Sequence, residues 1–242
     1  MKRFRNEDVK NKIFIASEIV CAVFSLLGVV LSLLYYARDG YFHWSRRLLY
    51  YTAQSNLWLS LSLFICFFLK LKSNLTKQSK SVLFLIKYVY TVSITVTGLV
   101  FCTLLAPLAP KSYNVWSLSG IVTHVFTPIL AIISLFFTPP ACKIEKKHCF
   151  IAMLPSLLYF IVVLFLSVLS FDFGRGDKFV YFFLDFTSFS SIWSVNLNSS
   201  PPLLGSFYWL IILLLTILSI ALLLRKLVNK QPKYLLFKNE RI

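Results

Sequence analysis

Two polar side chains stand out because they lie inside apolar segments, where a polar group is costly and usually faces a helix-bundle interior. Thr52 lies at the start of one such segment, and His124 lies in another, followed by Thr127 and Pro128. A buried imidazole within about 2.6–3.2 Å of a hydroxyl can take its proton and make the oxygen a nucleophile. The pair therefore predicts a catalytic site with Thr52 as nucleophile and His124 as base. The alternative is a structural histidine bonded to a backbone carbonyl that Pro128 leaves free.

Ser55 and Asn56 extend the Thr52 position into a polar stripe. Residues 52, 55 and 56 are spaced i, i+3 and i+4, so they share one helix face. In a catalytic site, Ser55 or Asn56 would assist an oxyanion. The alternative is that the stripe ties helices together through hydrogen bonds.

The elements that must position these residues are membrane spans. Hydrophobic residues make up 58% of the 242 residues and charged residues only 14%, which excludes a soluble globular enzyme. A bilayer core of about 30 Å needs about 20 apolar residues in a helix. Six segments meet this length, at residues 13–36, 48–69, 82–106, 117–137, 150–170 and 203–224. The sequence predicts an all-α polytopic membrane protein, residues 1–242 forming a single bundle in which short connections make consecutive helices antiparallel neighbours.

The basic residues predict the orientation of these spans. The net charge of +16 could indicate a nucleic-acid binder, but 18 of the 25 Lys and Arg residues fall on one side of the predicted bundle and six on the other. This asymmetry follows the positive-inside rule, with both termini cytoplasmic, and predicts a multi-pass plasma-membrane protein whose partners are membrane lipids rather than nucleic acid. Thr52 then lies about 6 Å and His124 about 10 Å inside the external face, so the two share a similar depth.

The last connection is long, external and aromatic. It covers 32 residues, Phe171–Pro202, and its apolar run Phe179–Phe186 contains Tyr181 and Asp185. Long loops of this kind often serve function, so we consider a lid over the Thr52 site, in which Asp185 orients His124. The alternative for the loop is an interfacial aromatic belt, and we expect the other external acids, Asp39, Asp172 and Asp177, to be ordinary solvated loop residues.

Glu18 and Lys87 lie at matching depth near the cytoplasmic ends of two spans. Opposite charges at one depth favour a structural ion pair in the bundle, and the alternative is a Lys87 that reaches the headgroups by itself. The spacing of cysteine and histidine matches no metal pattern, and no nucleotide or cofactor motif is present, so we expect neither metal nor cofactor.

Three short motifs resemble a known family. Tyr51–Leu57 (YTAQSNL) resembles the F/Y-T-x-x-S-N-L opening of the second span in the bacterial Pr6Pr family, which is related to the eukaryotic androgen-induced gene family of six-span membrane proteins. His124-x-x-x-Pro128 resembles the family's H-x-x-x-P, and Tyr181–Asp185 resembles its external Y-P-x-x-F-L-D stretch. Phe182 replaces the proline of that stretch, and the acidic residue usual shortly after Pro128 is absent.

The resemblance implies an activity. The eukaryotic relatives are threonine hydrolases that cleave fatty-acid esters of hydroxy fatty acids with an intramembrane Thr and His, so it implies Thr52 as nucleophile, His124 as base and a lipid-ester substrate. The other hypotheses are a transporter or binding protein for a small amphiphile, and a structural membrane protein.

Overall fold

The computed structural model describes residues 2–38, 44–71, 75–109, 114–174, 176–196 and 203–231. Within these residues, six helical segments are long and apolar enough to cross a membrane. They are Lys12–Tyr35, Tyr51–Leu71, Lys77–Leu108, Leu118–Phe137, Lys146–Val168 and Ser206–Asn229. The chain is therefore a multi-span membrane protein of the all-α class, as predicted, with one short strand pair.

The helices are α1 (Lys2–Arg38), α2 (Tyr51–Leu71), α3 (Lys77–Val100), α4 (Ala106–Leu108), α5 (Leu118–Ile121), α6 (Thr127–Phe137), α7 (Lys146–Ile151), α8 (Leu154–Val168), α9 (Phe189–Trp193) and α10 (Ser206–Asn229). Two 3-10 segments, η1 (Trp44–Leu49) and η4 (Phe182–Leu184), and two π-helical segments, η2 (Phe101–Leu105) and η3 (Val122–Phe126), complete the helical part. Strands β1 (Val195–Asn196) and β2 (Leu203–Leu204) pair antiparallel.

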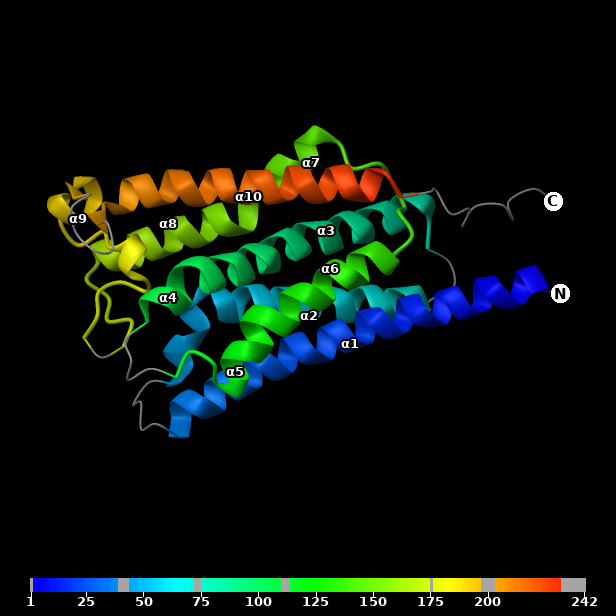
Figure 1. The fold of residues 1–242 in the computed structure, drawn as a ribbon, viewed down its shortest axis with the longest axis horizontal. Coiled ribbons are helices and arrows are strands. Elements are labelled where there is room, and N and C mark those ends of the chain that lie inside the picture. Colours follow the sequence, from blue (N-terminus) through cyan, green and yellow to red (C-terminus); the bar gives the residue numbers. More distant parts are fainter. Residues whose placement is uncertain are drawn as a thin grey trace.

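Figure 1 shows the helices running along one common direction. The start of α1 and the end of α10 lie at one end of the bundle, which we call the terminal end. The segments α4, α5 and α9 lie at the opposite end, which we call the loop end. Helices α1, α2, α3 and α6 pack on one another, and α10 packs against α3 on another side.

Small polar residues let the four packed helices approach closely, as is common in membranes. The Ser25 hydroxyl of α1 donates to the Asn56 carbonyl of α2 at 2.6 Å. The Ser60 hydroxyl donates back to the Ala22 carbonyl at 2.9 Å. A Cβ atom at Gly98 of α3 would lie only 2.8 Å from the His124 carbonyl oxygen, so only glycine allows this approach.

Two π-helical segments face each other near the loop end. Segment η2 continues α3 directly and precedes Pro107, and η3 precedes Pro128. Proline has no N–H and cannot close the regular helical bond, which favours such a local irregularity. The Phe101 ring of η2 stacks on the His124 imidazole of η3, with centroids 3.8 Å apart and planes 9° from parallel. π-Helical segments often occur at functional sites.

The structure differs from the sequence expectations at several span boundaries, for instance Lys77–Leu108 instead of 82–106, and in how the fifth span is built and packed. The fifth span begins at Lys146, because Glu145 and His148 form a capping box, and it is interrupted between α7 and α8 before Pro155. Consecutive spans are also not all neighbours: α6 packs on α1 and α3, whereas the next span meets α3 and α10 through α7. Asp39, residues 175 and 197–202 of the long connection, and basic residues including Lys72, Lys111 and those from Lys233 onward, lie outside the described residues.

Candidate functional site

Thr52 lies in the first turn of α2 and lines a small internal cavity at the loop end. The cavity measures about 40 Å³, and only 5% of the Thr52 surface is exposed. Its walls come from α2, α3 with η2, α8, the 171–205 connection and α10. The polar residues on these walls are Tyr51, Thr52, Thr97, Ser156, Tyr159 and Tyr181. A water needs roughly 10–15 Å³ of such space, so the cavity is large enough for one.

The long connection covers this cavity. Tyr181, Phe183 and Leu184 line it, and Phe183 and Leu184 are buried. The Tyr181 ring stacks on Phe183 with centroids 5.0 Å apart and meets the edge of Tyr50 at 5.6 Å. Side chains of the predicted lid therefore lie directly against the Thr52 site.

The Tyr181 hydroxyl points to the first turn of α2. It interacts with the Thr52 hydroxyl and with the backbone N–H groups of Tyr51 and Thr52. Burial raises the pKa of the Tyr181 phenol, and the Thr52 hydroxyl and the positive charge of Arg47 act in the opposite direction. The first N–H groups of a helix have no partner within the helix and attract negative charge. The Tyr181 oxygen thus lies at the N-terminus of α2, where the helix end favours negative charge.

His124 lies on η3 with 6% of its surface exposed. Its Nδ1 is buried without a hydrogen-bond partner among the described residues. No hydrogen bond joins the side chains of Thr52 and His124 in the part of the chain that the structure describes, and His124 does not line the cavity. The Asn56 amide connects the two backbones, because it donates to the Thr52 carbonyl at 2.8 Å and to the Thr123 carbonyl at 3.3 Å.

Ser55 and Asn56 serve packing in this structure. The Ser55 hydroxyl lies 2.9 Å from the Thr97 hydroxyl and 3.2 Å from the Thr52 carbonyl. Both Asn56 amide hydrogens point to carbonyls, so neither is available to an oxyanion. Asn56 thus ties two backbone segments together in this structure, and its expected role toward an oxyanion stays a prediction.

Thr127 and Asp185 also have local partners. The Thr127 hydroxyl donates to the Val122 carbonyl at 2.9 Å, which satisfies an acceptor of the π-helical segment. The Asp185 carboxylate accepts from the Thr187 N–H at 2.9 Å and from the Thr187 hydroxyl at 2.6 Å. Asp185 thus shapes its own turn, and no hydrogen bond between Asp185 and His124 occurs among the described residues.

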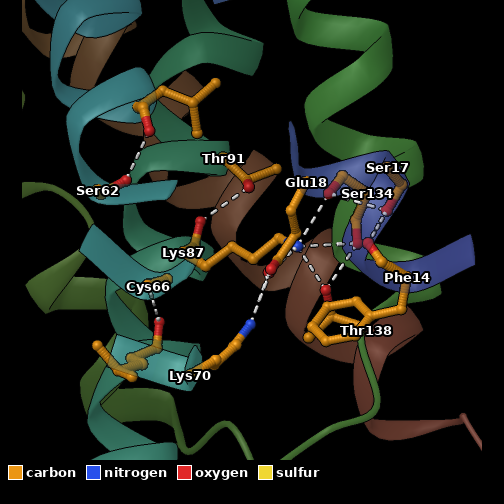
Figure 2. Close-up of polar contacts among 12 residues, drawn as sticks. Phe14, Ser17, Glu18, Ser62, Cys66, Lys70, Lys87, Thr91, Ser134 and Thr138 are labelled. Carbon is orange, nitrogen blue, oxygen red and sulfur yellow. Dashed lines mark hydrogen bonds and ion pairs between the residues drawn. The ribbon is translucent and has the colours of Figure 1, made fainter. Parts of the chain in front are cut away.

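Glu18 and Lys87 form the expected ion pair near the terminal end, and Figure 2 shows a larger network around them. The Lys87 ammonium lies 2.9 Å from Glu18 Oε1 and also donates to the Ser134 carbonyl, the Ser134 hydroxyl and the Thr138 hydroxyl. Lys70 is a second partner, 2.8 Å from Glu18 Oε2 and 4.2 Å from the Phe14 ring centroid. Glu18 and Lys87 are buried, whereas 31% of the Lys70 side chain is exposed.

Sequence reasoning missed two members of these sites. Tyr159 of α8 is buried, and its hydroxyl is the second buried side-chain atom without a partner in the described residues. A tyrosine inside an apolar run gives no pattern that could have identified it. Lys70 had a signal: a lysine in the last turn of a span has a stem long enough to reach a buried carboxylate.

Comparison with known proteins adds no family to this description. No family model matches the chain, and neither a curated protein nor a solved structure matches it. The fold and the site define a polytopic membrane protein with six candidate spans, which contacts membrane lipids.

Proposed function

We propose that the protein is an intramembrane hydrolase of lipid esters, with Thr52 as nucleophile and His124 as general base. The observation that carries the proposal is the covered cavity, in which the Thr52 side chain meets the N-terminus of α2. The unpartnered Nδ1 of His124 supports it, because a buried nitrogen without a partner is costly and is expected where a proton must be accepted. The Pr6Pr resemblance of Tyr51–Leu57 agrees with this assignment.

The reaction needs two acyl transfers. The Thr52 oxygen forms a bond to the ester carbonyl carbon while its proton passes to His124, and the developing oxyanion takes the place of the Tyr181 hydroxyl at the N-terminus of α2. The C–O bond to the alcohol then breaks, and the alcohol leaves with the proton from His124. A water next attacks the carbonyl carbon of the acyl-threonine and gives one proton to His124. The bond between this carbon and the Thr52 oxygen then breaks, and His124 returns the proton to the Thr52 oxygen, which leaves a carboxylic acid and the free Thr52 hydroxyl.

This chemistry requires movement. Tyr181 has to leave the first turn of α2, and His124 has to approach Thr52, since no hydrogen bond joins them in this state. Catalytic hydrogen bonds are often long before substrate binds. The described part of the 171–205 connection contains no helix longer than α9, which suits a segment that opens and closes.

Hydrolysis of a p-nitrophenyl acyl ester by purified protein tests the proposal. We expect Thr52→Ala to abolish hydrolysis and His124→Gln to lower it by about 10²–10⁴, the usual contribution of a general base. Thr91→Ala is the matched control, because Thr91 is also buried but its hydroxyl donates to the Lys87 carbonyl of its own helix at 2.8 Å. Equal rates in wild type and Thr52→Ala would refute the assignment and leave a binding or structural role.

We also propose a plasma-membrane location with both termini cytoplasmic, which the distribution of basic residues supports. The loop end and the Thr52 cavity would then face the external leaflet. Thiol-reactive labelling of intact cells tests this. A cysteine introduced at Thr187, in the long connection, should react with an impermeant reagent, and one at Lys147 should react only after the cells are opened.

A further inference from the structure

The cluster of Glu18, Lys70 and Lys87 carries one more positive than negative charge. The Glu18 carboxylate lies between the two ammonium groups, 2.9 Å from that of Lys87 and 2.8 Å from that of Lys70. Among the residues that the structure describes, no second carboxylate lies within ion-pair distance of either ammonium. One carboxylate therefore neutralises only one of the two lysines. A net charge among membrane-spanning helices is costly unless an opposite charge compensates it.

The excess charge is accessible at Lys70 and not at Lys87. The Lys87 side chain is 3% exposed, and its ammonium donates to Ser134 and Thr138 as well as to Glu18. The Lys70 ammonium donates to the two Glu18 oxygens, at 3.0 and 2.8 Å, and has no other hydrogen-bond acceptor among the described residues (Figure 2). An ammonium has three hydrogens, so one remains for a further acceptor. Since 31% of the Lys70 side chain is exposed, such an acceptor can reach it.

The Phe14 ring holds Lys70 in place beside α1. Its centroid lies 4.2 Å from the Lys70 nitrogen and 5.4 Å from the Lys87 nitrogen. The face of an aromatic ring attracts a cation but carries no net charge, so the excess charge remains. Glu18 and Phe14 together fix the position of a long side chain before any ligand binds, which lowers the entropy cost of binding.

Lys70 lies at the depth of the lipid headgroups. It is the last residue but one of the Tyr51–Leu71 span and belongs to the last turn of α2. Glu18 lies six residues after the start of the Lys12–Tyr35 span, about 9 Å further along α1. The cluster therefore extends from the headgroup region into the hydrocarbon region, with Lys70 nearest the headgroups. Phosphate groups of lipids are acceptors present at this depth.

The lipid-facing side of α2 leads to this position. Leu61, Ile65 and Phe68 are spaced i, i+4 and i+7, so they share one helix face, and each is at least half exposed. Leu71, which follows Lys70, is 66% exposed. The acyl chains of a phospholipid can therefore lie along α2 while its headgroup stays level with Lys70.

We propose that Lys70 binds the phosphate of an anionic phospholipid, which supplies the negative charge that the cluster lacks. Charge complementarity selects the lipid. A zwitterionic lipid brings an ammonium together with its phosphate and leaves the excess charge uncompensated, whereas a lipid with one net negative charge cancels it. In the orientation proposed above, this end faces the cytoplasmic leaflet, whose surface is anionic. Lys70 lies about 27 Å along α2 from Thr52, so the site is separate from the proposed hydrolysis.

Thermal unfolding of the purified full-length protein in a neutral detergent tests the site, because a ligand that binds the folded state raises the unfolding midpoint. The additives are phosphatidylglycerol, phosphatidylcholine with the same acyl chains, and inorganic phosphate. We expect phosphatidylglycerol to raise the midpoint by about 2–4 °C more than either of the others. An equal shift with phosphatidylcholine would overturn recognition of the net charge. An equal shift with inorganic phosphate would overturn the assignment to a lipid.

Two substitutions that remove the same charge distinguish this site from general attraction to a basic protein. Lys70→Gln should lower the apparent affinity for phosphatidylglycerol about fivefold, the effect of one basic group near an anionic surface. Lys226→Gln is the matched control, because Lys226 also lies in the last turn of its helix, α10, at the terminal end, but outside the cluster. Unchanged affinity in Lys70→Gln, or an equal loss in Lys226→Gln, would overturn the proposal.

Lys70→Arg tests whether the charge itself is recognised. This substitution keeps a cation at the end of α2, so the apparent affinity should stay within about twofold of that of wild type. A loss as large as that in Lys70→Gln would contradict recognition of the charge. Thr52→Ala should bind phosphatidylglycerol as wild type does, so the lipid site can be confirmed even if hydrolysis is refuted, and the reverse also holds.

Discussion

Glu18 is the residue whose replacement should destabilise the bundle most. Its carboxylate is the acceptor for two ammonium groups, at 2.9 Å for Lys87 and 2.8 Å for Lys70, and it is 1% exposed. Glu18→Gln keeps the size of the side chain but leaves Lys87 buried with only neutral acceptors. Removing one partner of a buried ion pair usually costs about 3–5 kcal/mol. The remaining hydrogen bonds of Lys87 to Ser134 and Thr138 offset part of this cost, so we expect Glu18→Gln to lower the free energy of unfolding by about 3 kcal/mol.

The two lysines should contribute unequally. Lys87→Met leaves Glu18 paired with Lys70, so its cost should be smaller than that of Glu18→Gln. Lys70 is 31% exposed and its side chain can turn toward solvent, so Lys70→Met should cost no more than about 1 kcal/mol. The double variant Glu18→Gln with Lys87→Met contains no buried charge at this position and should recover most of the loss, as replacement of buried ion pairs by neutral groups often does.

Titration with a denaturing detergent in mixed micelles measures the free energy of unfolding of the three single variants and the double variant. The predicted order of destabilisation is Glu18→Gln, then Lys87→Met, then Lys70→Met. A double variant less stable than Glu18→Gln alone, or a Lys70→Met variant as unstable as Glu18→Gln, would refute the view that Glu18 mainly neutralises Lys87.

Three further predictions concern the loop end. Gly98→Ala should lower stability by about 1–3 kcal/mol in a thermal unfolding assay, because its Cβ would lie 2.8 Å from the His124 carbonyl oxygen and 2.9 Å from Pro128 Cγ. Gly28→Ala should cost less in that assay, because its Cβ meets the Thr123 side chain first. Burial raises the pKa of the Tyr181 phenol above the ordinary value of about 10. The neutral phenol therefore stabilises the closed connection fully below about pH 10, and this stabilisation should be lost as the pH rises above that value. Protease sensitivity of the connection should then increase above pH 10 in wild type and less in Tyr181→Phe, whereas equal pH profiles would contradict the role of the phenol. The Arg46 side chain, 2.7 Å from Asp172, holds the pKa of that carboxyl below its usual range. Asp172→Asn should therefore speed proteolysis near Gly174 without a measurable change in the unfolding midpoint. In wild type the same faster proteolysis should appear only as pH falls below about 4.

The spans could be predicted from the sequence because membrane insertion depends on length and apolarity, which the sequence shows directly. The start of the Lys146–Val168 span depends on a capping box, and its interruption depends on Pro155. Both act through local geometry rather than through hydrophobicity. The π-helical segments before Pro107 and Pro128 add a residue to the helical turn and change which side chains face the interior. For this reason residue spacing alone could not place His124 against Phe101.

The candidate site could be predicted only in part. Glu18 and Lys87 were identifiable because two charges in apolar spans have few favourable arrangements. The position of Thr52 and the long aromatic connection could be read from the order of residues along the chain, and the structure brings both to one cavity. The two carbonyl partners of the Asn56 amide could not be predicted, because spacing gives the face of a helix but not the groups that face it. Tyr159 became a candidate only when the structure showed that it is buried and lines the Thr52 cavity.

Trapping an acyl-threonine tests the proposed chemistry most directly. Purified protein is mixed with a p-nitrophenyl acyl ester, quenched in acid within the first turnovers, digested and examined by mass spectrometry. We predict an acyl adduct on the peptide that contains Thr52, present in wild type and Thr91→Ala and absent in Thr52→Ala. An adduct on another residue, or no adduct in a preparation that releases p-nitrophenol in a Thr52-independent manner, would contradict the assignment of Thr52 as the nucleophile.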